Sequence, residues 1–193
     1  MAAKQESCAF TGHRPEKLPW GDNERDPRCV ALRKRILQAL WTAYDEGYRY
    51  FLCGMAQGCD LLFGVEALRL RGVCPEVKVE AAVPYPEQAD RWPAPQRERY
   101  RILLEACDQK TLVSPRYTPH CLLRRDRYLV DRASLLLAAY DGSPGGTKYT
   151  ILYTLQQKIE VRYIPVSEET DPDGRNFEGR PRNSGCNLPA NAV

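Results

Sequence analysis

Short apolar runs alternate with amphipathic segments along most of this 193-residue chain, and this alternation limits its fold more than any other feature. Runs such as Tyr50–Cys53 and Leu135–Ala139 have the length of buried strands, whereas Leu32, Ile36 and Leu40 recur at helical spacing. Strands that alternate with helices form βαβ units, and their right-handed crossovers build a parallel sheet. The sequence therefore predicts an α/β domain with helices on both faces of one sheet.

Each expected element ends at turn-forming residues or where the hydrophobic period changes. The expected strands cover residues 8–10, 50–53, 77–83, 110–113, 135–139 and 161–165. The expected helices cover residues 28–46, 60–71, 95–106, 122–132 and 147–158, with Gly47 and Gly72 ending the first two. This pattern is typical of a Rossmann-like three-layer α/β/α sandwich with a mostly parallel sheet of about six strands.

The pattern stops near residue 166. Residues 1–166 are expected to form one domain, long enough to bury a core. Residues 167–193 are rich in Asp, Glu, Pro, Gly and Asn and poor in apolar side chains, so we expect a disordered tail.

Three glycine-bearing turns follow strands and precede helices, at Thr11–Pro15, Gly54–Asp60 and Asp141–Thr147. Glycine lets backbone N–H groups approach an anion closely, and the helix behind each turn adds unpaired N–H donors. In a parallel sheet all such turns lie along the carboxyl edge, so we expect the three to converge on one crevice. They predict a site for a nucleotide-type ligand.

The candidate binding residues in these turns carry small, hydroxyl, imidazole, guanidinium or carboxylate side chains. They are Thr11, Gly12, His13, Arg14, Gly54, Ala56, Gly58, Asp60, Asp141, Gly142, Gly145, Gly146 and Thr147. Some roles stay open: His13 could act as a general base or as a hydrogen-bond donor, Asp60 could cap a helix or accept from a ribose hydroxyl, and Thr147 could cap a helix or contact phosphate. Lys148 does not stand where a Walker motif places its lysine, which excludes an ATP-hydrolysing P-loop.

Arg124 and Arg125 lie at the start of the expected helix 122–132. Positive charge there opposes the helix dipole unless an anion offsets it, which makes this pair a candidate for neutralising the ligand's charge. The alternative is a charged helix face in solvent.

Composition sets further limits. The formal net charge of +3 does not by itself indicate nucleic-acid binding. Eight cysteines are scattered without a C-x-x-C pair, and there are two histidines, so we expect no metal site. Cys53 and Cys59 flank the second turn. We rank a redox role for them below the interpretation that they are small buried apolar residues. We expect a cytoplasmic protein, since no stretch has the length and apolarity of a membrane helix and Met1–Ser7 lacks a secretory signal.

Several motifs together resemble the SLOG superfamily, and within it the bacterial and prophage proteins grouped with YpsA and YoqJ. The resemblance extends from Cys8 to about Pro165 and implies a Rossmann-like nucleotide-binding domain. The segments that carry it are Phe10–Pro15, Gly54–Asp60, Arg124–Asp131, Tyr140–Gly142 and Gly145–Thr147.

Two branches of that superfamily suggest different functions. Gly54–Asp60 and Arg124–Arg127 are similar to segments of DprA, which binds single-stranded DNA. Arg124, Arg125 and Pro144–Thr147 are similar to the basic pair and phosphate loop of LOG phosphoribohydrolases. The glutamate expected after that loop is absent.

Lys148, Tyr149 and Thr150 stand in its place, and Glu66 or Asp141 would have to substitute for it. We therefore expect binding of a nucleotide or nucleotide-derived small molecule, with sensing as one role of that binding. No further cofactor and no catalytic residue is assigned. Phosphoribohydrolase-like cleavage of nucleoside monophosphates and DprA-like binding of single-stranded DNA are the alternatives. Homo-oligomerisation stays open, and no membrane partner is expected.

Overall fold

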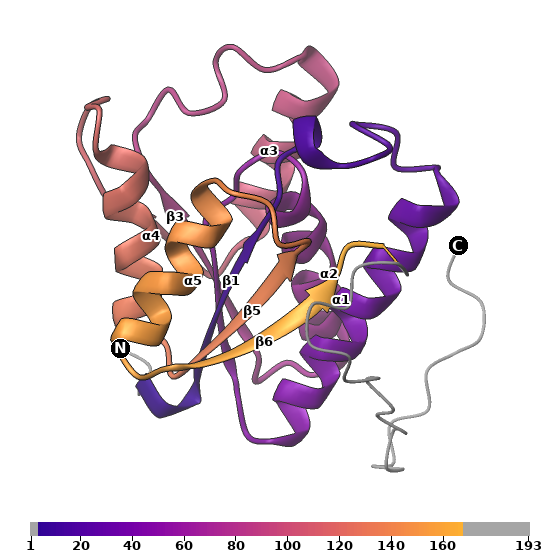
Figure 1. The fold of residues 1–193 in the computed structure, drawn as a ribbon, viewed down its shortest axis with the longest axis vertical. Coiled ribbons are helices and arrows are strands. Elements are labelled where there is room, and N and C mark those ends of the chain that lie inside the picture. The colour runs from indigo at the N-terminus through magenta and orange to yellow at the C-terminus, as the bar shows by residue number, and fades with distance from the viewer. Residues whose placement is uncertain (1–3, 168–193) are drawn as a thin grey trace.

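The computed structural model describes residues 4–167, which form a single parallel sheet of six strands between two layers of helices (Figure 1). The strand order is β4-β3-β2-β1-β5-β6, and all five neighbouring pairs run parallel. The strands are β1 (Ser7–Gly12), β2 (Tyr50–Cys53), β3 (Lys78–Val83), β4 (Gln109–Leu112), β5 (Leu135–Tyr140) and β6 (Glu160–Pro165).

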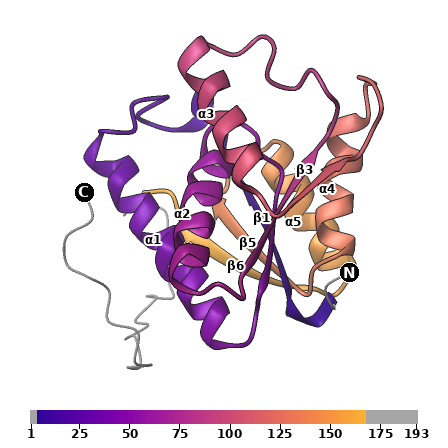
Figure 2. The same cartoon turned by 180° about the vertical axis from the view of Figure 1, so that it is seen from behind.

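Five α-helices connect these strands, and two short 3-10 helices, η1 (Lys4–Glu6) and η2 (Pro15–Lys17), flank β1. Helices α1, α2 and α3 cover one face of the sheet, and α4 and α5 cover the other (Figures 1 and 2). The helices are α1 (Pro27–Asp45), α2 (Cys59–Val73), α3 (Ala94–Ala106), α4 (Cys121–Asp131) and α5 (Gly146–Gln156). The predicted Rossmann-like three-layer sandwich is confirmed.

The strands alternate their buried side chains between two cores. In β5, Leu135 and Leu137 pack toward α1 and α2, whereas Leu136 and Ala138 pack toward α4 and α5. The rings of Phe10 and Phe63 stack with centroids 4.3 Å apart in the first of these cores. Burial on both faces explains why the strands read as continuous apolar runs.

Every observed helix starts and ends within two residues of its expected range, but the residue expected to end α2 does not end it. Gly47 follows the end of α1 as expected, but α2 runs through Gly72 to Val73, so Gly72 does not end that helix. A glycine in a helix lowers its stability without breaking it, because its amide still donates to the preceding turn. The tail from residue 168 onward lies outside the described residues, and its disorder stays a prediction.

The strand order places β1 in the middle of the sheet and sends the chain to both sides of it. From β1 the chain moves outward through β2 and β3 to β4, then returns across the sheet to β5 on the other side of β1. Beyond β1 the chain continues to α1 on one face, and beyond β5 it continues to α5 on the other face (Figure 1). In open α/β sheets this reversal, the switch point, is where ligands bind. We call this part of the carboxyl edge, between β1 and β5, the switch-point edge.

Candidate functional site

The first and second glycine turns are in direct contact. The backbone N–H of Cys59 donates to the carbonyl oxygen of His13 over 3.0 Å. Gly58 has a φ of +86°, and a Cβ added there would lie 2.6 Å from that same carbonyl oxygen. Only glycine fits this position, because any other side chain would both strain the backbone and push the two turns apart.

The first and third turns are joined across the switch point by His13 and Asp141. Nε2 of His13 lies 2.6 Å from Oδ1 of Asp141, and since an ionised carboxylate only accepts, the imidazole donates. The backbone N–H of Ser143 donates to the same oxygen over 2.9 Å. His13 is 2% exposed, while the side chain of Asp141 is 26% exposed. The pair therefore holds the ends of β1 and β5 together and leaves part of one carboxylate accessible.

The surroundings of Asp141 keep this carboxyl ionised. Partial burial acts to raise its pKa, but hydrogen bonds from Ser143 and the interaction with His13 outweigh that effect and hold the pKa below its ordinary value. A carboxylate of this kind accepts hydrogen bonds from hydroxyl groups and does not serve as a proton donor at neutral pH.

The N-terminus of α5 is open. Its N-cap is Gly145, at a φ of +149°, and no side chain of the described residues caps it. A Cβ added to Gly146 would meet no atom within 4 Å. The ammonium of Lys17 donates to the carbonyl of Pro144 beside it. Unpaired backbone N–H groups, a helix dipole and a lysine thus surround an open space, which is an arrangement suited to an anion.

Thr147 does not cap α5, as one of its two expected roles required. The N-cap is Gly145, and Thr147 is the second helical residue, buried to 7% exposure. A helix that starts after Thr147 and one that starts after Gly145 both fit a threonine that follows two glycines. The sequence pattern therefore could not decide which residue is the N-cap.

The second turn is supported from within by a buried ion pair. Nη1 of Arg125 lies 3.5 Å from Oδ2 of Asp60, Nε of Arg125 donates to Asp126 over 2.8 Å, and the side chains of Arg125 and Asp60 are each 7% exposed. The guanidinium occupies the space where Gly54 would carry a Cβ. Arg125 therefore already has carboxylate partners within the protein.

Asp60 serves this internal cluster instead of capping α2. The N-cap of α2 is Gly58, and Asp60 lies in its first turn, where it accepts a hydrogen bond from the N–H of Ala56 over 3.2 Å. Burial raises the pKa of Asp60 to about 6, although the charge of Arg125 works in the opposite direction. Its low exposure places it beneath the turn, away from a ligand lying on the surface.

The remaining predicted residues differ in how far they are exposed to solvent. Thr11 and Gly12 are the last residues of β1, and a Cβ on Gly12 would overlap the side chain of Cys59. Ala56 is buried, whereas Gly142 and Arg124 are exposed. Arg124, whose Nη1 is 3.5 Å from the hydroxyl of Ser114, forms no ion pair within residues 4–167, unlike its neighbour Arg125.

The alternative roles of cysteine and Glu66 find no support in the geometry. The seven described cysteines are buried and unpaired, and burial raises the pKa of Cys53 and Cys59, which disfavours a reactive thiolate. Glu66 lies in α2, and its carboxylate is 2.7 Å from Arg33 of α1 and 3.2 Å from Arg69 of its own helix. It is thus engaged away from the glycine turns. Within residues 4–167 no three His, Cys, Asp or Glu side chains gather as a metal site would require.

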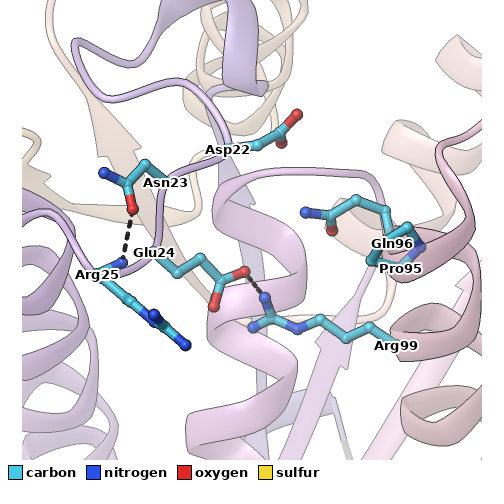
Figure 3. Close-up of a pocket in the computed structure, with 7 residues that line it drawn as sticks. All are labelled: Asp22, Asn23, Glu24, Arg25, Pro95, Gln96 and Arg99. Atoms are coloured by element: carbon cyan, nitrogen blue, oxygen red, sulfur yellow. Dashed lines mark hydrogen bonds and ion pairs between the residues drawn. The ribbon is translucent and has the colours of Figure 1, made fainter.

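Two hollows lie apart from the glycine turns. One, of about 480 Å³, separates the loop 22–25 from the start of α3, and Glu24 and Arg99 form an ion pair across it (Figure 3). The other, of about 280 Å³, lies between α1 and β6 and is lined by residues that include Arg35 and Arg162. None of the residues predicted for the site lines either hollow.

Sequence reasoning missed Lys17 and Ser143. Lys17 lies in η2 and reaches the third turn, 127 residues away in sequence, and Ser143 contributes only its backbone N–H to Asp141. No local signal marks a lysine in a loop as part of a distant turn. Ser143 stands inside the third turn, so the spacing to Asp141 could have indicated an Asx-type contact.

Comparisons with known proteins agree with this architecture. The model of the YspA SLOG family matches residues 8–167. The YpsA protein of Bacillus subtilis is 26% identical over 161 residues, which is 82% of this chain and 88% of the relative. No helix within residues 4–167 combines the length and apolarity needed to cross a bilayer.

Two solved structures share the fold at low identity. DNA processing protein A (DprA) of Streptococcus pneumoniae superposes with a TM-score of 0.54 at 14% identity over 83% of this chain and 50% of that one. DprA of Helicobacter pylori, described in a single-stranded DNA binding mode, gives a TM-score of 0.54 at 11% identity over 83% of this chain and 65% of that one. The chain thus spans about half to two thirds of these proteins, and the likeness is one of fold.

Proposed function

Because the chain belongs to the YspA SLOG family, whose fold it shares with DprA, we propose that it binds and senses a nucleotide or nucleotide-derived ligand at the switch-point edge. One observation carries the proposal. The open N-terminus of α5 faces empty space next to Asp141. His13 holds Asp141 at the ends of β1 and β5, where the chain beyond each strand turns to opposite faces of the sheet. This is where an open α/β sheet binds its ligand.

The phosphate of the ligand would lie at the start of α5. The N–H groups of Gly146 and the residues after it have no helical acceptor of their own, and the helix dipole favours negative charge there. Gly146 leaves the approach unobstructed. Lys17 adds a positive charge beside Pro144. Arg14, from the first glycine turn, and Arg124, from the start of α4, would add to this field.

The ribose would lie against Asp141. An ionised carboxylate beside a phosphate-binding helix accepts hydrogen bonds from ribose hydroxyls in dinucleotide-binding domains of this architecture. The partial exposure of Asp141 and the hydrogen bond from His13 fit that role. A carboxylate held ionised favours binding over proton donation to a leaving base.

A thermal-shift panel of nucleotides, cyclic nucleotides, NAD and ADP-ribose tests the proposal. We expect at least one compound to raise the unfolding temperature of the wild type. Gly146→Asp should abolish that shift by placing a carboxylate where the phosphate lies, and Gly146→Ala should preserve it, because a Cβ fits there. A panel without any shift, or a shift that survives Gly146→Asp, contradicts the proposal.

Binding of single-stranded DNA is a second candidate, favoured by the likeness in fold to two DprA proteins. It predicts oligonucleotide affinity that falls steeply with salt, since contacts to phosphates release counterions. Fluorescence anisotropy at several salt concentrations measures this. An affinity that is absent or insensitive to salt rules the candidate out.

Cleavage of nucleoside monophosphates is a third candidate, in which the ionised and partly exposed carboxylate of Asp141 would act as a nucleophile or base and not as a proton donor. Incubation with AMP at high protein concentration should then release adenine and ribose 5-phosphate, and Asp141→Asn should abolish the release. If the wild type releases no free base, this candidate is ruled out.

A further inference from the structure

Two loops at the carboxyl edge bring a pair of tyrosines together. Residues 113–120 follow β4 and lie above α4, and residues 84–93 follow β3 and pass beside that loop on their way to α3 (Figures 1 and 2). The rings of Tyr85 and Tyr117 meet with centroids 5.1 Å apart and planes at 78°. Such an edge-to-face contact fixes the orientation of both rings and leaves ring surface uncovered.

Tyr117 presents most of that surface to solvent. It is 62% exposed, whereas Tyr85 is half-buried behind it. The aromatic pair therefore consists of an anchored ring and an open one. An open, oriented aromatic face is what proteins use to stack a nucleobase, since every base offers a π-face.

Arginines lie in both of these loops and in the first glycine turn. Arg14 and Arg91 lie close enough to counteract the burial that raises the pKa of Tyr85, and Arg116 precedes Tyr117 in the chain. Within residues 4–167 none of these three arginines forms an ion pair with a carboxylate, in contrast to Arg33 and Arg99. The charge of the phosphates that accompany a base would find compensation here.

The tyrosine pair is connected to the glycine turns by direct contacts. Nε2 of Gln88, in the loop of Tyr85, donates to the carbonyl oxygen of Met55 in the second turn over 3.0 Å. A Cβ on Gly58, in the same turn, would lie 3.0 Å from Cα of Arg14. The loop of Tyr85 is thus linked to the second glycine turn, and that turn is linked to Arg14 of the first glycine turn.

We propose that Tyr117, supported by Tyr85, is the base-stacking surface for the ligand, with Arg14, which follows β1, offsetting the charge of phosphates that extend to the start of α5. This inference rests on the proposed function and assigns the part of the site that recognises the aromatic base. A free nucleotide and a base in a single strand offer the same stacking chemistry. The experiment separates these two sources.

Calorimetric titration with AMP, ADP-ribose and a short oligo-dA, alongside pyrophosphate and ribose 5-phosphate as probes without a base, tests the assignment. Tyr117→Ala should weaken the base-containing probes about 5- to 100-fold, the range that loss of one stacked base produces. Tyr117→Phe, which keeps the ring, should bind within about twofold of the wild type. Tyr153→Ala, on α5, is a matched control and should leave every affinity unchanged.

The outcomes are distinct. A loss in Tyr117→Ala for AMP or ADP-ribose but not for pyrophosphate supports the stacking surface with a free nucleotide as its source, and a loss for oligo-dA alone supports it with a single strand as its source. An equal loss for pyrophosphate, or no loss for any probe, overturns the assignment while the proposed function stands. If no probe binds the wild type, the proposed function fails and the stacking surface fails with it.

Discussion

Helices α1 and α5 begin in opposite ways at the same edge of the sheet. In α1, the carboxylate of Asp26 accepts from the N–H of Arg28 over 2.9 Å, and Pro27 occupies the first helical position. In α5 a glycine stands at the N-cap, and no described side chain completes the helix end. The first turn of α1 thus has a side-chain acceptor within the protein, whereas the first turn of α5 has none among the described residues.

Helix α2 is an intermediate case. Its N-cap is also a glycine, Gly58, but the carboxylate of Asp60 folds back beneath the turn toward Ala56 and Arg125. The open space lies in front of α5, whereas the first turn of α2 is packed against His13 and Arg14. The ends of α1 and α2 are therefore expected to contribute to stability, and the end of α5 to the binding that we propose.

The largest effect on stability should come from Gly58→Ala. The φ of +86° and the carbonyl oxygen of His13 at 2.6 Å from the new Cβ should together cost about 2–4 kcal/mol of unfolding free energy. Urea denaturation measures this. Gly72→Ala, in the last turn of the same helix with no atom near its Cβ, should instead stabilise by about 0.5–1 kcal/mol. Equal effects of the two substitutions would mean that the turns are not locked together.

The buried carboxyl of Asp60 should make stability depend on pH. Its pKa of about 6 in the folded state exceeds the ordinary value of 3.8, so the folded protein retains this proton longer than the unfolded chain. The stabilisation is fully present below about pH 4 and is lost as the pH rises through about 6, by on the order of 2–3 kcal/mol. The difference in unfolding free energy between wild type and Asp60→Asn isolates this effect. A difference that is constant from pH 4 to 7 would contradict it.

Gly146→Asp should separate binding from stability. A carboxylate at the first position of α5 makes this end resemble that of α1, so the helix should gain about 0.3–1 kcal/mol from the dipole. Ligand affinity should fall at least about tenfold, because the new charge repels a phosphate. Thermal unfolding with and without the ligand found in the panel reports both quantities. If the variant is destabilised and still binds, the open end of α5 is a structural feature and not a site.

Asp26→Ala should have the smallest effect. Loss of the cap should lower the unfolding temperature by roughly 2–6 °C. The ligand-induced shift should not change, because this helix end is already complete without a ligand. A reduced shift would show that the end of α1 contributes to the site as well.

Local patterns predicted most of the fold. The strand Tyr50–Cys53 has the bounds expected from its apolar run, and α3 differs from its expected range by one residue, because hydrophobic period and turn residues act over short distances. The prediction that Gly72 ends α2 was wrong, because it rested on a local pattern alone. Glycine often follows a helix, but in α2 the helical hydrogen bonds continue past it to the N–H of Cys74.

The pairings within the site could not be read in this way. His13 and Asp141 are 128 residues apart, and Asp60 and Arg125 are 65 apart. The contact between His13 and Asp141 exists because β5 returns to the far side of β1, and strand order depends on long-range packing. The sequence predicted the residues of the candidate site, but it could not show that Arg125 is neutralised internally while Arg124 is left exposed.

The sequence by itself determined the alternation of strands and helices, the glycine turns after β1, β2 and β5, and their common position on the carboxyl edge. These follow from hydrophobic period, glycine chemistry and the handedness of parallel crossovers. Only the tertiary structure decided which helix end is capped, which charges are paired and which aromatic ring is open. Those properties depend on distances between segments far apart in the chain, which are set by how the two helical layers pack on the sheet.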